Sequence, residues 1–305
     1  MYVHHKETFY PTSFQELFSI WNYRKDAVLC AGGTGFMCDQ YNRIPELPGN
    51  VISLDKLEEL RKINRTERYL EIGAMVNLNQ VIYLGKIVPE ALTRCLACIE
   101  GPQLRNLATI GGNICYSSKK LDTTGPMIAL DAQYELRSAQ SVRWITASRF
   151  SSSLDLNPDP KWSRREIHGP PLLGKNELLT RIRIPLEPWN FTSYHKFSSH
   201  GNNRPGGAIL FMARTQKSTL YDIRIVYSGE IVLRKKNSES MLAGKRLPLS
   251  EKDAASFVDI WKNYLSELSG MENSIFAKES VNFKPELVKT QILNFIEASI
   301  RRISE

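Results

Sequence analysis

Two glycine-rich segments offer the clearest chemistry in this sequence, because both could bind a phosphate group through the backbone. The first reads Ala31-Gly32-Gly33-Thr34-Gly35, and the second reads Thr109-Ile110-Gly111-Gly112-Asn113. Glycine adopts positive φ without steric penalty, and its missing side chain lets backbone N–H groups approach a ligand closely. Consecutive N–H groups turned inward form an anion-binding nest, to which the hydroxyls of Thr34 and Thr109 could add donors. The two segments together favour a phosphate-containing cofactor.

Other nucleotide-binding motifs are missing from the sequence. It contains neither G-x-x-x-x-G-K-[ST] nor a G-x-G-x-x-G between a strand and a helix. A single Gly-Gly pair is most often a simple turn, so one such segment alone would favour the turn. Two segments, each beside a threonine, favour the cofactor.

The cysteines do not form a recognisable metal or disulfide site. They are Cys30, Cys38, Cys95, Cys98 and Cys115, an odd number in a long chain, which argues against a disulfide framework. Cys95 and Cys98 form a C-x-x-C, but no second pair and no histidine lies nearby. Iron–sulfur and zinc sites need more ligands. We therefore expect these two cysteines to be buried helix thiols, and we expect no metal site.

No residue of the sequence is predicted to act as a catalytic acid, base or nucleophile. The five histidines lack metal-ligand spacing, apart from the adjacent His4-His5 near the N-terminus. Ser228 does not lie in a G-x-S-x-G motif. Asp131 and Glu135 are interpreted as surface charges at strand edges rather than as an acid/base pair.

Composition and charge exclude several classes of function. Hydrophobic residues make up 42% and charged residues 24% of the 305 residues, which is ordinary for a globular protein. The net charge is +8, but the basic residues are scattered and lack interleaved aromatic rings, which argues against nucleic-acid binding. No apolar run approaches the ~20 residues of a membrane span. Because the N-terminus also lacks a signal-type apolar region, a cytoplasmic protein is expected.

The elements that must position the two glycine segments can be predicted from hydrophobic periodicity. Ahead of the second segment, we expect helices at 13–21, 78–84 and 92–100, a helical turn at 56–61, and strands at 27–31, 51–54 and 69–74. The strand at 27–31 ends directly at the first glycine segment. After the second segment, residues 134–138 and 141–145 resemble a hairpin. Residues 157–174 indicate a long loop, and the strand at 177–185 closes on Pro185 at a domain edge.

The last third of the sequence has a different character. Three antiparallel strands are expected at 209–214, 220–226 and 230–234, followed by helices at 252–268 and 285–303. The chain is therefore expected to be an α+β protein with a separate C-terminal unit.

A family resemblance covers nearly the whole chain in order. Residues 101–114, Gly-Pro-Gln-Leu-Arg-Asn-Leu-Ala-Thr-Ile-Gly-Gly-Asn-Ile, closely resemble the second flavin loop of the FAD subunits of molybdenum hydroxylases, the xanthine dehydrogenase and carbon monoxide dehydrogenase family. Ala31-Gly32-Gly33-Thr34 resembles the first flavin loop. The likeness continues through 72–74, Asp122, 130–132, 176–179, 184–185, 194–197, 223–225 and 242–244.

The resemblance implies a fold and a domain division. An FAD-binding module of the vanillyl-alcohol-oxidase (PCMH-like) type is expected at 1–186, with subdomains at about 1–56 and 57–186. A C-terminal flavoprotein domain, with a three-stranded antiparallel sheet and helices, is expected at 187–305. This division agrees with the elements predicted from periodicity.

The resemblance also implies which residues contact FAD. The cofactor-binding residues are expected to be Leu29, Cys30, Ala31, Gly32, Gly33, Thr34, Gly35, Phe36, Ile99, Thr109, Ile110, Gly111, Gly112, Asn113, Asp122, Leu179 and Lys196. The two glycine segments are expected to surround the pyrophosphate. Asp122 is expected to accept hydrogen bonds from cofactor hydroxyls or loop amides, because a carboxylate beside a diphosphate is repelled.

As a function, the resemblance implies an oxidoreductase subunit that transfers electrons. Electrons would come from iron–sulfur clusters on a partner chain, served by a molybdopterin subunit, and would leave the FAD to NAD⁺ or another acceptor. Two alternatives remain open: a self-sufficient FAD-dependent reductase, and an interaction subunit without flavin. The sequence departs from the family pattern at Thr123-Thr124-Gly125-Pro126 and at Gly206-Gly207-Ala208, which bears on access of the electron acceptor.

Overall fold

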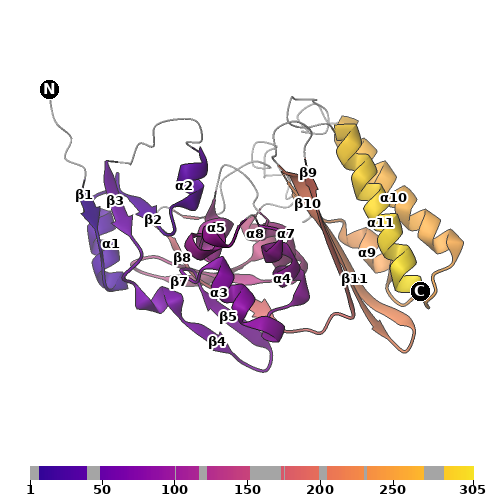
Figure 1. Ribbon diagram of the computed structural model, residues 1–305, viewed down its shortest axis with the longest axis horizontal. Helices are drawn as coiled ribbons and strands as arrows, with labels where there is room; N and C mark the ends of the chain where they lie inside the picture. Colours follow the sequence, from indigo (N-terminus) through magenta and orange to yellow (C-terminus); the bar gives the residue numbers. More distant parts are fainter. Residues whose placement is uncertain are drawn as a thin grey trace.

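The computed structural model describes residues 7–39, 49–99, 101–116, 122–151, 173–174, 176–198, 205–229, 232–270 and 285–305. The loop expected at 157–174 lies outside the described residues except at its last two positions. The described elements form three β-sheets arranged in a row, with helices on and between them (Figure 1).

The first sheet is small and parallel. It contains β1 (Glu7–Phe9), β2 (Val28–Cys30) and β3 (Asn50–Ser53) in the order β1-β3-β2. Between β1 and β2 lies α1 (Phe14–Tyr23), which begins as expected after Ser13. The Ser13 hydroxyl accepts the Glu16 N–H at 3.2 Å and so caps the helix. Helix α2 (Thr34–Asp39) follows β2 after three residues.

The second sheet has five antiparallel strands in the order β4-β5-β8-β6-β7. The strands are β4 (Ile63–Arg65), β5 (Tyr69–Gly73), β6 (Gln133–Arg137), β7 (Val142–Thr146) and β8 (Leu178–Pro185). The helices attached to it are η1 (Glu58–Arg61), α3 (Leu78–Tyr83), η2 (Gly85–Ile87), α4 (Glu90–Ala97), α5 (Pro102–Leu107), α6 (Ile110–Cys115), α7 (Thr124–Ala129) and α8 (Ala147–Phe150). The predicted hairpin is the pair β6 and β7.

The C-terminal sheet has four strands, so the prediction of three was wrong. The strands are β9 (Phe191–Ser198), β10 (Pro205–Gln216), β11 (Thr219–Ser228) and β12 (Val232–Leu233), in the order β12-β11-β10-β9. The missed strand, β9, lies at the sheet edge and mixes polar and aromatic side chains. Its residues do not form the apolar run by which the other strands were predicted.

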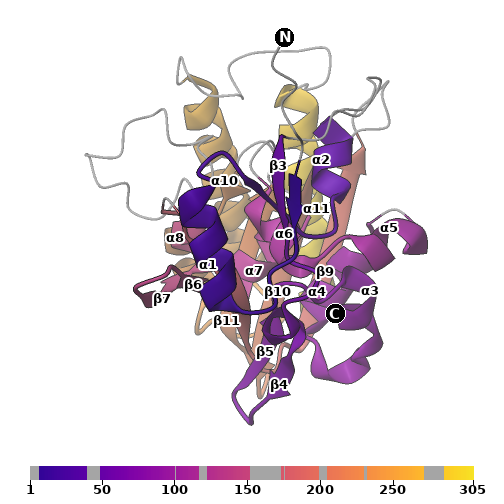
Figure 2. The ribbon, with the colours of Figure 1, turned by 90° about the vertical axis from the view of Figure 1, so that its left-hand side faces the viewer.

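The C-terminal sheet is buried on both faces. Leu210 and Met212 of β10 pack into the core of the second sheet, whereas Ile209 and Phe211 pack toward the C-terminal helices. Those helices are α9 (Lys236–Leu242), α10 (Glu251–Gly270) and α11 (Pro285–Ser304). Seen from the side of the first sheet, α1 lies in front and α10 and α11 lie behind (Figure 2). None of the described helices is long and apolar enough to span a bilayer.

Candidate functional site

The two glycine segments meet at one pocket between the first and second sheets. The pocket has a volume of about 520 Å³, within the usual range for small-molecule sites. Twelve of the predicted cofactor residues line it: Leu29, Cys30, Ala31, Gly32, Gly33, Thr34, Gly35, Phe36, Thr109, Gly111, Gly112 and Leu179. Residues far apart in the sequence are thus brought together in one pocket, whereas their contacts with FAD stay a prediction.

The first glycine segment contains N–H donors without a partner among the described residues. It turns from β2 into α2 through Gly33, whose φ of +69° favours glycine. The N–H groups of Thr34, Gly35 and Phe36 begin α2 and have no hydrogen-bond partner in the described part of the chain. Helix starts leave such donors unsatisfied. This segment therefore offers the donor geometry that a diphosphate needs.

The second glycine segment is not the open nest that its sequence suggests. The Thr109 side chain caps α6 by accepting the Gly112 N–H at 3.1 Å. The N–H groups of Ile110 and Gly111 donate to Val76 O and Ala74 O, both at 2.9 Å, and Asn113 N–H donates to Thr109 O. All four N–H groups therefore have partners. This segment does not offer a row of free donors, but its glycines line the pocket without side chains and so let a ligand approach the backbone closely.

The remaining five predicted residues lie outside the lining of this pocket. Ile110 is fully buried and packs in the core of the second sheet. Asn113 accepts a hydrogen bond at 2.5 Å from the buried Thr123 hydroxyl, a partner that the sequence did not suggest. Thr123 also lies in the stretch that departs from the family pattern.

Lys196 contacts both Asp122 and the C-cap residue of α4, and so links the two. Its ammonium lies 3.0 Å from the Asp122 carboxylate and donates to the Cys98 carbonyl at 3.4 Å. The next residue, Ile99, is buried, and its carbonyl accepts a hydrogen bond from Arg105. Three predicted contacts, Ile99, Asp122 and Lys196, therefore form a second group beside α7.

Several pocket residues were missed by sequence reasoning, among them Tyr116 and Glu177. The ring of Tyr116 covers Gly35, because a Cβ built there would lie 2.6 Å from it. Arg143 binds both Glu177 carboxylate oxygens at 2.7 Å, and Glu177 accepts the Gly174 N–H at 2.6 Å. The hydrogen bonds from Arg143 hold the pKa of Glu177 below its ordinary value. In the sequence, the only indication that Glu177 belongs to the site is its position in the segment 176–179, which is part of the family resemblance.

The cysteines only partly match the expectation of buried thiols. Cys95 is fully buried, but Cys98 is exposed, because it follows the last turn of α4. Burial, with a smaller effect from Asp122, raises the pKa of the Cys95 thiol. Burial raises the pKa of Cys115 to about 12. The described residues contain no cluster of side chains that could hold a metal ion.

These surroundings predict selective thiol labelling. At about pH 8, a thiol with a pKa near that of Cys115 has roughly a thousandfold less thiolate than an ordinary cysteine. We expect iodoacetamide to modify Cys98 rapidly and to leave Cys95 and Cys115 unmodified in the native protein. Peptide mapping by mass spectrometry measures this, and denatured protein, in which all three should react, is the control. Cys115 is half-buried and lines the pocket, so rapid native labelling there would contradict its raised pKa, whereas labelling of Cys95 would contradict its full burial.

Glu135 is not the surface charge that we expected. The residue is 9% exposed, and its carboxylate accepts a hydrogen bond from the Thr180 hydroxyl at 2.7 Å. Asp131, by contrast, pairs with Arg224 and Arg234 near the C-terminal sheet. Neither Glu135 nor Asp131 lines the pocket, so these two carboxylates do not form an acid/base pair there.

Comparison with known proteins gives one family match and several relatives. Residues 4–187 match the family described as the FAD binding domain in molybdopterin dehydrogenase. The chain is similar to the nicotinate dehydrogenase FAD-subunit of Eubacterium barkeri, with 33% identity over 95% of this chain and 97% of that protein. It is also similar to the carbon monoxide dehydrogenase medium chain of Hydrogenophaga pseudoflava, with 25% identity over 76% of this chain and 77% of that one.

The fold is shared with solved structures as well. It superposes on a chain of quinoline 2-oxidoreductase from Pseudomonas putida 86 with a TM-score of 0.78 and 20% identity. The match covers 98% of this chain and 96% of that one. The whole arrangement of the three sheets therefore recurs in a protein of known structure.

Proposed function

This chain belongs to the family of FAD binding domains in molybdopterin dehydrogenases, and from that premise we propose that it is the electron-transferring FAD subunit of a molybdenum hydroxylase complex. The family match and the relatives named as FAD subunits identify the cofactor as FAD and the chain as an oxidoreductase subunit. When bound, FAD supplies the redox chemistry, and the side chains position it and tune its potential.

One observation supports the proposed position of FAD. The same pocket is lined by the start of α2, whose first three N–H groups have no partner among the described residues, and by the small residues Gly111 and Gly112. A Cβ built at Gly112 would lie 3.9 Å from the Ala31 Cβ of the first glycine segment. We propose that α2 binds the pyrophosphate and that the two glycines let it approach closely. Asp122 and Lys196 are proposed to contact more distant parts of the cofactor.

The three sheets support the proposed division of the chain. The first sheet with α1 forms the subdomain at about 1–56, the second sheet forms 57–186, and the C-terminal sheet with α9, α10 and α11 forms 187–305. Each sheet has its own cluster of buried hydrophobic residues, although η1 and parts of β8 contribute to the first cluster and β10 to the second.

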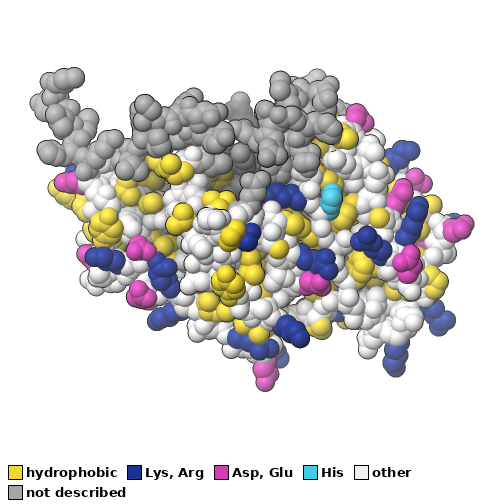
Figure 3. All heavy atoms as spheres, in the orientation of Figure 1, with side chains coloured by type: hydrophobic (Ala, Val, Ile, Leu, Met, Phe, Trp, Pro, Cys, Tyr) yellow, Lys and Arg dark blue, Asp and Glu magenta, His cyan; other side chains and the backbone are white. Residues whose placement is uncertain are grey.

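Partner chains are proposed from the relatives, several of which are named as a subunit or chain of a larger dehydrogenase. We propose that electrons reach this chain from an iron–sulfur subunit and leave to NAD⁺ or another acceptor. The face in Figure 3 shows Lys and Arg interspersed with Asp and Glu rather than one basic patch, which favours protein partners over nucleic acid.

Purification of the native protein tests the proposal. We expect a yellow protein that releases one FAD per chain on denaturation and copurifies with an iron–sulfur chain and a molybdopterin chain. A colourless protein that binds no added FAD would instead support an interaction subunit without flavin. Substrate turnover by the isolated chain with FAD alone would support the self-sufficient reductase.

A further inference from the structure

Helix α7 lies between the proposed FAD site and the C-terminal sheet. All six of its residues are buried. Gly125 packs so closely on β11 that a Cβ there would lie 2.8 Å from the Ser228 hydroxyl oxygen. The helix therefore has little room to shift unless the sheet moves with it.

The N-terminal end of α7 contacts residues proposed to bind FAD. Thr123, which is 0% exposed, donates its hydroxyl hydrogen bond to Asn113 Oδ1 at 2.5 Å. Asp122 pairs with Lys196 of β9 at 3.0 Å. A displacement of this end would therefore move both Asn113, which lies in α6, and Asp122, which directly precedes Thr123.

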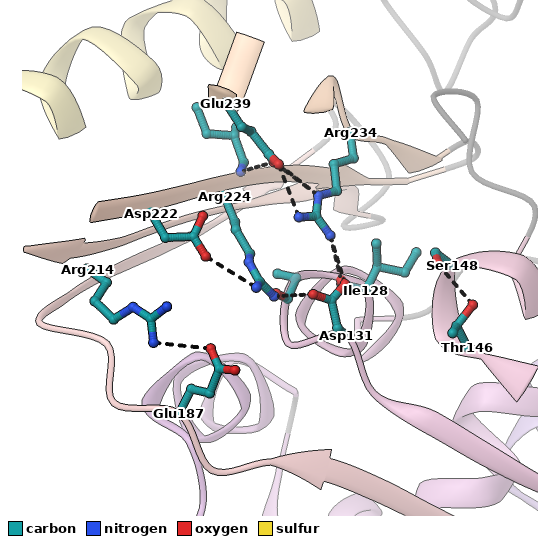
Figure 4. Close-up of polar contacts among 12 residues, drawn as sticks. Ile128, Asp131, Thr146, Ser148, Glu187, Arg214, Asp222, Arg224, Arg234 and Glu239 are labelled. Atoms are coloured by element: carbon teal, nitrogen blue, oxygen red, sulfur yellow. Dashed lines mark hydrogen bonds and ion pairs between the residues drawn. The ribbon is translucent and has the colours of Figure 1, made fainter. Parts of the chain in front are cut away.

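The C-terminal end of α7 is held by two arginines, Arg224 of β11 and Arg234, which directly follows β12 (Figure 4). Arg224 donates to Ala129 O at 2.5 Å and pairs with the Asp131 carboxylate at 2.6 Å. Arg234 donates to Ile128 O at 3.0 Å and to the other Asp131 oxygen at 3.2 Å. Cations beside the last carbonyls of a helix satisfy them and complement its dipole.

These two arginines are themselves fixed from the opposite side. Glu239 of α9 binds Arg234 at 3.0 Å and accepts the Ile225 N–H at 3.0 Å, and the side chain of Arg234 is only 6% exposed. Burial raises the pKa of Glu239, and Arg234 opposes that shift. Asp222 contacts Arg224 at 3.3 Å. The two arginines thus join the C-terminal sheet to the end of α7 in one polar network.

We propose that Arg224 and Arg234 are positioning residues for the FAD site, acting through α7 on Thr123 and Asn113. Among the described residues, neither arginine has a hydrogen bond or ion pair to one that lines the pocket, and their effect is to hold the far end of the helix that places Asn113. The family match ends at residue 187, so both arginines lie outside the matched region. This inference rests on the proposed FAD-binding function.

Arg224 and Arg214 provide a matched pair of variants. Both are on the C-terminal sheet, and their guanidinium carbons lie 4.8 Å and 5.8 Å from the centre of the Trp189 ring. Arg214 pairs with Glu187 rather than with α7. Arg224→Met removes the contacts to α7, whereas Arg214→Met removes a similar ion pair without touching that helix. Arg224 is the better target than Arg234, because its loss does not leave the buried Glu239 unpaired.

The experiment is a titration of each full-length apoprotein with FAD, followed by flavin fluorescence and by visible circular dichroism at saturation. We expect Arg224→Met to weaken FAD binding roughly tenfold and to change the dichroism of bound flavin, and Arg224→Lys to restore part of both. Arg214→Met should match wild type. The proposal is overturned if Arg224→Met binds within about twofold of wild type with an unchanged spectrum, or if both methionine variants lose affinity equally. Wild-type protein that binds no FAD would instead refute the proposed function.

Discussion

The Gly112→Val variant is expected to lose FAD while its C-terminal sheet and helices stay folded. A Cβ at Gly112 would lie 2.8 Å from Thr109 Oγ1 and 3.9 Å from the Ala31 Cβ, so it points across the pocket toward the first glycine segment. The two γ-methyls of valine would occupy the space between the segments. They would also displace the Thr109 hydroxyl that caps α6. We expect FAD affinity to fall by about a hundredfold or more, because a misplaced diphosphate loses several charge-assisted hydrogen bonds together.

The measurement is the FAD content of purified protein together with titration of the apoprotein. Gly112→Ala should lie between wild type and valine, since its single methyl can be accommodated by rotation of the Thr109 side chain. Hydrogen exchange of α10 and α11 reports the fold of the C-terminal unit and should be unchanged. Full FAD occupancy in Gly112→Val would show that the pyrophosphate does not lie between the two segments.

The long elements of this fold could be predicted because their periodicity is strong. Helix α11 and strand β8 were each expected within about two residues of their observed bounds. Their apolar residues recur at helical or alternating spacing over several turns or residue pairs. The glycine segments were equally visible, since the pocket gathers both of them. The glycine segments alone predicted a phosphate-containing cofactor, and the family resemblance identified that cofactor as FAD.

The missed features depend on tertiary contacts that no local pattern encodes. Helices α5, α6 and α7 have six residues each, too few for a period of 3.6 to be recognised. The N–H groups of the second glycine segment are occupied by Ala74 and Val76, which come from a distant part of the chain. Glu135 is buried because Thr180 of a neighbouring strand satisfies it. Strand β9 is stabilised by pairing with β10 rather than by its own sequence.

The second large effect is expected for Gly32→Ala, which should destabilise the fold because the added methyl group would overlap with the backbone of Leu107. A Cβ at this position would lie 1.8 Å from the Leu107 carbonyl oxygen and 2.8 Å from its carbon. Both atoms belong to the backbone at the end of α5, so no side-chain rotation can relieve the overlap. Gly32→Ala must therefore separate the first glycine segment from the residues that lead into the second. We expect a cost of about 3 kcal/mol, a melting temperature lower by roughly 5 °C or more, and at least tenfold weaker FAD binding.

Gly49→Ala is the matched control, because it adds the same methyl group where nothing in the described structure lies within 4 Å. The φ of Gly49 lies outside the left-handed region, so alanine there should be neutral or stabilise by up to about 1 kcal/mol through the unfolded chain. Thermal melting with and without saturating FAD distinguishes the loss of fold stability from the loss of FAD affinity. If Gly32→Ala only destabilised the fold, its affinity measured well below the melting temperature would equal that of wild type. A loss of affinity at that temperature, absent in Gly49→Ala, would show that the close approach of Gly32 to Leu107 sets the spacing of the two glycine segments and that this spacing matters for FAD binding.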